Sequence, residues 1–240
     1  MPRMTSTTRL ELAALDAPDI EALAAFYTEL TGGEVVRNVP GWITVRLTSG
    51  PEIAFQEAPD HVAPQWPGQE RPQQFHLDLL IDDHEAAAAR AVELGATRLA
   101  DGATWITLAD PAGHPFDLCQ RDGVEQMELF AVTLDAPDAA ALAHFYADLL
   151  ELEVSYGGPE GAMITAEPTS LMFQQISGYN APQWPDPSRP QQAHLDILVD
   201  DLNAGEERAL ALGATRLDGG APTFRVFADP ARHPFCLTAG

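Results

Sequence analysis

Two His-x-Asp pairs are the residues of this sequence whose types and spacing best suit chemistry. His76 and Asp78 form the first pair, and the same pattern returns as His194 and Asp196. In a strand, side chains two residues apart point to the same face, so each carboxylate can accept a hydrogen bond from its imidazole. Such a bond holds the ring in one tautomer and raises its basicity. The four residues are therefore candidate catalytic groups, as general bases or as donors to a ligand; the alternative is a polar pair that only braces the sheet.

A Pro-rich segment that carries a tryptophan precedes each pair. Ala63-Pro64-Gln65-Trp66-Pro67 returns as Ala181-Pro182-Gln183-Trp184-Pro185, and Arg-Pro-Gln-Gln follows in both places. Prolines stiffen the backbone, and a tryptophan side chain offers a large rigid surface with one N–H donor. Trp66 and Trp184 are therefore candidate ligand-binding residues that cover a site and stack on a planar ligand; alternatively, they close the hydrophobic core.

The composition excludes several classes of function. The 13 basic residues among 240 are all arginine, against 36 acidic residues, and the formal net charge is −23. A chain without lysine has no Schiff-base lysine and no phosphate-loop lysine. Its acidity argues against nucleic acid and anionic membrane surfaces as partners, because both are bound by basic patches. No apolar run approaches the roughly 20 residues of a membrane span, and the first residues lack the apolar core of a signal peptide, so we expect a cytoplasmic protein.

The chain is a tandem duplication. Besides the two pairs, Leu15-Asp16-Ala17-Pro18-Asp19 returns at 134–138 and Leu94-Gly95-Ala96-Thr97-Arg98-Leu99 returns at 212–217, always at an offset of 118 or 119 residues. A repeat of this length indicates two copies of one whole domain. We predict a disordered N-terminus at residues 1–8, a first domain at 9–120, a polar linker at 121–126 and a second domain at 127–240.

Each half contains a strand, a helix and further strands, twice over. Apolar residues at helical spacing, between an aspartate and a glycine, predict helices at residues 19–30 and 83–94 of the first half. Short apolar runs predict strands at 10–15, 34–36, 42–47, 52–56, 76–81, 97–99, 105–108 and 116–119. The second half repeats this order, with helices near 138–150 and 202–212. Four such modules predict an α+β fold.

The order of these motifs, found twice, resembles the vicinal oxygen chelate superfamily, and most closely its glyoxalase-like and bleomycin-resistance-like branch. The resemblance rests on Leu-Asp-Ala-Pro-Asp before a helix that contains Phe-Tyr, on His-Leu-Asp-x-Leu-x-Asp-Asp, on the Leu-Gly-Ala-Thr helix stop and on Asp-Pro-x-x-His-Pro-Phe near the end of each half. It covers nearly the whole chain. It implies two tandem glyoxalase-like domains, each of two βαβββ modules whose mixed sheet curls into a cup that holds the ligand.

The resemblance also implies a candidate metal site in the first domain. Enzymes of that family bind a divalent metal through residues of the first and last strands of each module. His76, Asp117 and Gln56 match three of these positions. The fourth falls near Leu12, which cannot ligate a metal, although the neighbouring Glu11 could if the register shifted by one residue.

The second domain departs further from the family pattern. His194 and Gln174 match two ligand positions, but Cys236 replaces the carboxylate, and the first strand offers only apolar residues. No cofactor is therefore certain, and a divalent metal is a candidate only in the first domain. Gln56 and Gln174 are also candidate ligand-binding residues in the absence of a metal.

Two functions are compatible with these residues. In the first, a small organic molecule binds in the cup and is converted by His and Asp in a lyase- or isomerase-type reaction, with or without a divalent metal. In the second, a protein without catalytic activity sequesters a drug or metabolite, for which the acidity favours a cationic ligand. Single-copy relatives pair as dimers, so fusing two copies in one chain predicts a monomer or a loose homodimer.

Overall fold

The computed structural model describes residues 8–186 and 189–239, and in this part of the chain it has sixteen strands and four helices. The α+β class and the repeated order of strand, helix and further strands are confirmed. The predicted disordered N-terminus at residues 1–8 lies outside the described residues, apart from Thr8.

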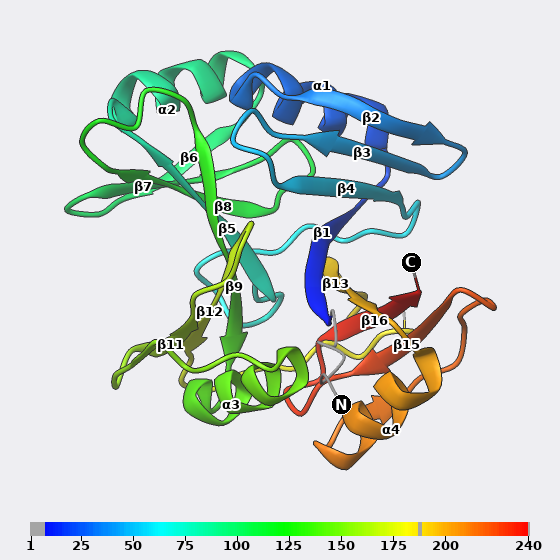
Figure 1. The fold of residues 1–240 in the computed structure, drawn as a ribbon. Helices are drawn as coiled ribbons and strands as arrows, with labels where there is room; N and C mark the ends of the chain where they lie inside the picture. Colours follow the sequence, from blue (N-terminus) through cyan, green and yellow to red (C-terminus); the bar gives the residue numbers. More distant parts are fainter. Residues whose placement is uncertain (1–7, 187–188, 240) are drawn as a thin grey trace.

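Four consecutive βαβββ modules make up the chain (Figure 1). Module 1 has β1 (Arg9–Ala17), α1 (Ile20–Thr31), β2 (Glu34–Val39), β3 (Trp42–Arg46) and β4 (Glu52–Glu57). Module 2 has β5 (Phe75–Ile81), α2 (His84–Glu93), β6 (Thr97–Asp101), β7 (Trp105–Ala109) and β8 (Pro115–Gln120). Module 3 has β9 (Glu128–Ala136), α3 (Ala139–Leu150), β10 (Tyr156–Gly157), β11 (Gly161–Ile164) and β12 (Ser170–Gln175). Module 4 has β13 (Ala193–Val199), α4 (Leu202–Ala211), β14 (Thr215–Arg216), β15 (Phe224–Ala228) and β16 (Pro234–Ala239).

Each helix begins directly after an aspartate that caps it. The carboxylates of Asp19, Asp83 and Asp138 each accept a hydrogen bond of 2.9 Å from the backbone N–H three residues later, and Asp201 accepts a similar bond of 3.0 Å. Such a cap satisfies an N–H group that has no partner inside the helix and places negative charge at the positive end of the helix dipole. The predicted helices agree with α1 to α4 to within one residue at each end.

The strands form two eight-stranded mixed sheets. Sheet A has the order β14-β15-β16-β13-β1-β4-β3-β2, and sheet B has the order β10-β11-β12-β9-β5-β8-β7-β6. At the centre of each sheet the first strands of two modules run antiparallel, β1 beside β13 and β5 beside β9. We call the face of sheet A that carries His194 cup A, and the face of sheet B that carries His76 cup B.

The modules pair across the two halves of the chain. Sheet A joins module 1 to module 4, and sheet B joins module 2 to module 3, so each sheet in Figure 1 runs from the first half to the second. The resemblance implied instead that the two modules of one half share a sheet. The repeat reveals four modules with similar first strands, but it does not encode which of these strands pair. Each cup therefore lies between the halves and takes residues from both.

Within each half, the two modules pack through their helices. The ring of Tyr27 on α1 stacks on Phe55 of β4, with 5.4 Å between centroids, and meets Phe116 of β8 edge to face at 6.3 Å. The Tyr27 hydroxyl donates to Asp110, which also holds the His114 ring at 3.0 Å. A single buried cluster of apolar residues includes members of all four modules, so the two sheets share one core.

Two glutamines of the repeated Arg-Pro-Gln-Gln segment bond the halves to each other. The backbone N–H of Gln74 donates to Gln192 Oε1, and the backbone N–H of Gln192 donates to Gln74 Oε1, both at 3.0 Å. Their Nε2 atoms donate to the carbonyls of Pro190 and Pro72, both at 2.8 Å. Both side chains are buried, so these four bonds, which we call the glutamine clasp, hold the halves together away from water.

Candidate functional site

Cup B contains a pocket of about 530 Å³ that takes side chains from both halves. Trp66, Trp105, Tyr156 and Phe173 supply its aromatic surface, and His76, Asp78, Asp117 and Glu160 supply its ionisable groups. A mostly apolar wall with a few converging polar groups is the usual form of a small-molecule site. The pocket therefore suits a small organic ligand.

His76, Asp78 and Asp117 form the polar centre of this pocket, and we call them the cup B trio. His76 and Asp78 come from β5, and Asp117 lies directly opposite Asp78 on β8. His76 Nε2 lies 3.8 Å from Asp78 Oδ2 and 3.9 Å from Asp117 Oδ2, and one ligand atom from each residue lies within 4.8 Å of the other two. These distances are too long for hydrogen bonds. The three groups therefore point toward one another, and no direct hydrogen bond between them occupies their polar atoms.

Neighbouring side chains hold the trio in place. Gln73 Nε2 lies 3.3 Å from His76 Nδ1 and 3.1 Å from Asp135 Oδ1. An amide nitrogen donates, so Nδ1 accepts and the ring proton of a neutral His76 sits on Nε2, which faces the two carboxylates. The hydroxyl of Thr133 donates to Asp78 Oδ2. Residues of both halves thus fix the orientation of the imidazole and of one carboxylate.

The environment of Asp117 makes it a candidate for proton transfer. Burial raises the pKa of Asp117, and the charge of Asp78 adds to this effect, whereas His76 and a hydrogen bond from Thr107 lower it. The balance is a raised pKa. A carboxyl group with a raised pKa takes up a proton more readily than an ordinary aspartate does.

The cup B trio fits a divalent cation. An imidazole nitrogen and two carboxylate oxygens are donors that Zn²⁺, Mn²⁺ and Fe²⁺ accept. Two ligand atoms about 2.1 Å from one cation stand roughly 3–4 Å apart, and the distances from Nε2 to the two carboxylates fall in this range. The residues that line the pocket include no arginine, so a cation would neutralise charge that nothing else offsets. Ligation by Nε2 requires the ring proton to move to Nδ1, with Gln73 presenting its amide oxygen to it.

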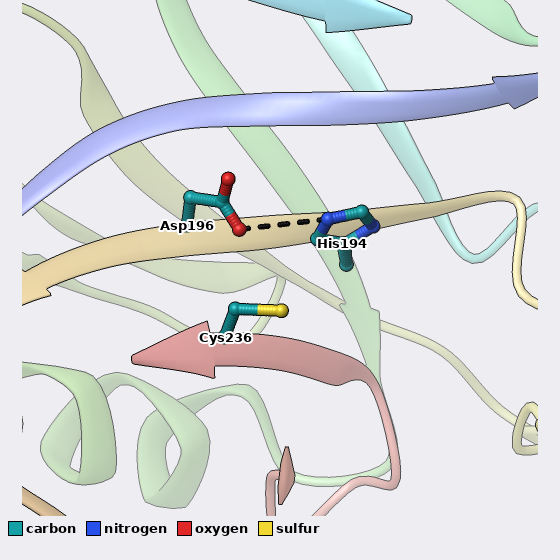
Figure 2. A group of neighbouring side chains, drawn as sticks. All are labelled: His194, Asp196 and Cys236. Carbon is teal, nitrogen blue, oxygen red and sulfur yellow. Dashed lines mark ion pairs between the residues drawn. The ribbon is translucent and has the colours of Figure 1, made fainter. Parts of the chain in front are cut away.

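Cup A carries a corresponding group of different chemistry, formed by His194, Asp196 and Cys236 (Figure 2). His194 Nε2 lies 3.5 Å from Asp196 Oδ1, and Cys236 lies opposite Asp196 on β16. Burial lowers the pKa of His194 to about 4 and, with the nearby charge of Glu11, raises the pKa of Asp196 to about 7. Burial and Asp196 also raise the pKa of the Cys236 thiol. Near neutral pH this group therefore holds an uncharged imidazole and a protonated thiol, which is a weak nucleophile.

The wall of cup A opposite this group is apolar. Leu12, Ala14 and Ala54 form a small buried cluster, against which Trp42 packs. The Trp42 ring lies 6.1 Å from the ring of His194. His194 Nδ1 is buried and has no hydrogen-bond partner among residues 8–186 and 189–239. Leu12 and Ala14 thus offer no metal ligand here, and a buried thiol with a raised pKa suits an open metal site less well than the two carboxylates of cup B do.

Because the modules pair across the halves, some predicted site residues lie in a different cup from the one expected. Gln174 of β12 lines the pocket that contains His76. Gln56 lies on β4 of sheet A, opposite Trp42 and beside Asp16. This corrects the grouping of Gln56 with His76 and Asp117 as a metal site, because module 1 shares its sheet with His194 and not with His76.

The two repeated Pro-rich segments, residues 63–74 and 181–192, are the straps that connect the modules of each half. Trp66 of the first strap lines cup B, and Trp184 is half-buried in the second strap. Sequence reasoning missed Trp105, Tyr156 and Glu160, which reach cup B from β7 and from the β10–β11 hairpin. For Trp105 a signal existed, because Trp105 and Thr107 alternate along β7 and must face the same side as each other.

The paired βαβββ modules and the cup with its His and Asp residues define the class of glyoxalase-like proteins. The model of the glyoxalase-like domain family matches residues 13–119 and again residues 131–238. Since these matches cover most of the chain, the protein belongs to this family and carries the domain twice. No curated protein sequence matches the chain significantly.

Solved structures support the same fold. Glyoxalase I from Zea mays is 20% identical, with a TM-score of 0.70 over 98% of this chain and 93% of the other. A putative dioxygenase from Bacillus subtilis is 12% identical, with a TM-score of 0.63 over 96% of this chain and 84% of the other. The cppA protein from Streptococcus pneumoniae is 13% identical, with a TM-score of 0.56 over 98% and 99%. At these identities the likeness concerns the fold alone. In the part of the chain that the structure describes, the helices are too short or too polar to span a membrane.

Proposed function

We propose that this glyoxalase-like protein binds a small organic molecule in cup B and converts it in a lyase- or isomerase-type reaction. The observation that carries this proposal is the cup B trio in the wall of the pocket of about 530 Å³. A pocket of this size encloses a molecule of metabolite size, and the trio can hold a cation or exchange a proton. In cup A, by contrast, the indole ring of Trp42 lies 6.1 Å from the ring of His194.

The residues of cup B have distinct roles in this reaction. A divalent cation held by His76 Nε2 and by the carboxylates of Asp78 and Asp117 would polarise an oxygen atom of the substrate. Without a cation, Asp117 is the group suited to accept a proton, because burial raises its pKa, and His76 Nε2–H is the donor beside it. Gln73 and Thr133 keep the imidazole and the Asp78 carboxylate in position while a substrate binds.

A second candidate function is the sequestration of a cationic compound without conversion. It is favoured by the charge of the lining, in which Asp78, Asp117 and Glu160 are acidic and no residue is arginine. Aromatic faces such as those of Trp66 and Trp105 attract cations as well. In this function the cup B trio binds the ligand but transfers no proton.

Manganese binding, followed by electron paramagnetic resonance, tests the role of the cup B trio. We expect the wild type to bind Mn²⁺ at one site per chain, His76→Ala and Asp117→Asn to lose that site, and the matched cup A variant His194→Ala to keep it. Equal loss in His194→Ala, or unchanged binding in His76→Ala, contradicts the metal-assisted reaction.

Proton exchange separates the two candidate functions. A panel of α-hydroxy ketones is incubated with the protein in D₂O, and deuterium incorporation is followed by ¹H NMR. A lyase or isomerase of this kind should exchange the hydrogen next to the carbonyl, and His76→Ala should not. A compound that binds in cup B and is recovered without exchange supports sequestration.

The chain is further proposed to act as a monomer or loose homodimer in the cytoplasm, without nucleic-acid or membrane partners. The sheet pairings β1 with β13 and β5 with β9 both occur within one chain, so no second copy is needed to complete a cup. Cys119 and Cys236 are free thiols, which a reducing compartment maintains.

A further inference from the structure

The two cups differ at one position of a middle strand. Trp42 of β3 lies opposite Gln56 in sheet A, and Gly161 of β11 lies opposite Gln174 in sheet B. These are equivalent positions of modules 1 and 3, since they are 119 residues apart and their partners are 118 residues apart. One cup therefore has an indole ring at a position where the other has no side chain.

The indole of Trp42 occupies cup A as a bound aromatic ring would. Its centroid lies 6.1 Å from the His194 ring at an interplanar angle of 47°. Its Nε1–H donates to Thr44 Oγ1 at 3.0 Å. The ring also packs against the small apolar cluster of Leu12, Ala14 and Ala54. The ring thus lies beside His194 and against apolar side chains, and its N–H group donates to Thr44.

In cup B the corresponding space is open and the backbone keeps it open. Gly161 lines the pocket of about 530 Å³ together with His76. A Cβ atom at Gly161 would come within 2.3 Å of the Phe173 carbonyl oxygen. Any other residue at this position would displace the backbone, so β11 cannot supply a ring of its own as β3 does.

We propose that cup B takes a flat aromatic ligand of about indole size, uncharged or cationic, whose ring occupies the place that Trp42 occupies in cup A. The inference rests on the proposed function only in taking cup B as the ligand site. Trp42 then acts as a permanent occupant that leaves the chain with one site instead of two.

The charge of the cup B wall decides between cationic and anionic ligands. Asp78, Asp117 and Glu160 line the pocket, and no arginine does. The faces of Trp66 and Trp105 attract a cation and stack on a flat ring. The ligand class is therefore a flat aromatic amine rather than an aromatic acid.

Three probes that share one ring but differ in charge test this ligand class. Indole is uncharged, tryptamine carries an ammonium group and indole-3-acetate carries a carboxylate. Isothermal titration of the metal-free wild type should show one site per chain, with tryptamine bound at least tenfold more tightly than indole-3-acetate. Preferred binding of indole-3-acetate, or saturable binding of none of the three, overturns the proposal.

Trp42→Gly tests whether the indole of Trp42 stands in for a ligand. Removing the ring should open cup A, so that indole binds at two sites per chain and raises the melting temperature of the variant more than that of the wild type. The matched variant Trp42→Phe keeps a ring in cup A and should still bind one indole. One site in both variants contradicts the role of Trp42. If Trp42→Gly does not fold, Trp42→Ala with indole present during refolding gives the same comparison.

The outcome is distinguishable from failure of the proposed function. If the indole probes do not bind while Mn²⁺ binds in a His76-dependent manner, the ligand class is wrong and the proposed function stands. If tryptamine binds to His76→Ala as tightly as to the wild type, and Mn²⁺ does not bind, the ligand class stands and the metal-assisted reaction fails.

Discussion

The glutamine clasp should contribute strongly to stability, and Gln192→Met is the change that tests it. Methionine keeps the length of the side chain but removes both polar atoms. The variant therefore loses the bond from the Gln74 N–H to Oε1 and the bond from Nε2 to the Pro72 carbonyl. A buried donor or acceptor that loses its partner costs about 1–3 kcal/mol. For one donor and one acceptor we expect a loss of about 2–6 kcal/mol in the free energy of unfolding.

Urea unfolding followed by circular dichroism measures this loss. Gln183→Met is the matched control, because Gln183 is exposed on the same Pro-rich segment as Gln192 and its replacement should change stability by less than about 0.5 kcal/mol. Because each cup lies between the halves, Gln192→Met should also weaken binding of tryptamine in cup B. A loss below about 1 kcal/mol, or equal losses in the two variants, would refute the view that the clasp holds the halves together.

Three further predictions concern the remaining buried polar groups and the assembly. Tyr27→Phe and Tyr146→Phe each remove a hydroxyl that donates to a buried aspartate, so each should lower the free energy of unfolding by about 1–3 kcal/mol in urea titrations; a smaller effect than that of replacing exposed Tyr156 by Phe would contradict this. The pKa of Asp196 rises from 3.8 to about 7 on folding, so the folded state binds more protons there and stability from this group falls as pH rises from about 4 to 7. The pKa of His194 falls from 6.5 to about 4, so its contribution rises with pH over the same range. The slope of the free energy of unfolding against pH should therefore become more positive in Asp196→Asn and more negative in His194→Gln. A slope that changes in the same direction in both variants would contradict the raised pKa of Asp196 and the lowered pKa of His194. Light scattering should give the mass of a monomer or of a dimer that dissociates on dilution, whereas an obligate tetramer would contradict the assembly inferred from the pairing within one chain.

Much of the fold could be predicted from the sequence because its signals are local. Aspartate caps, glycine stops and apolar periodicity depend on neighbouring residues, and α1 to α4 begin and end close to where these signals lie. The duplication identified four modules for the same reason. The partner of each module could not be predicted, because β1, β5, β9 and β13 present similar edges and the long straps between modules allow either pairing.

The candidate site was predictable only in part. His76, Asp78 and Asp117 lie close together on two neighbouring strands of module 2, and period-two alternation is enough to bring the first two to one face. Gln73, Thr133 and Gln174 reach this group through pairing across the halves, which no local pattern encodes. The sequence already has Trp42 in one half and Gly161 at the equivalent position of the other. Only the structure shows that the Trp42 ring lies beside His194, and therefore that the two cups differ.

In the function that we propose, the chain has one functional cup, built between its halves around His76, Asp78 and Asp117. Anomalous diffraction from crystals soaked in Mn²⁺ tests it most directly, because it locates the ion without relying on activity. We predict one strong anomalous peak per chain, bounded by His76 Nε2 and the carboxylates of Asp78 and Asp117. A peak of equal height beside His194, Asp196 and Cys236, or a peak only in cup A, would contradict the claim.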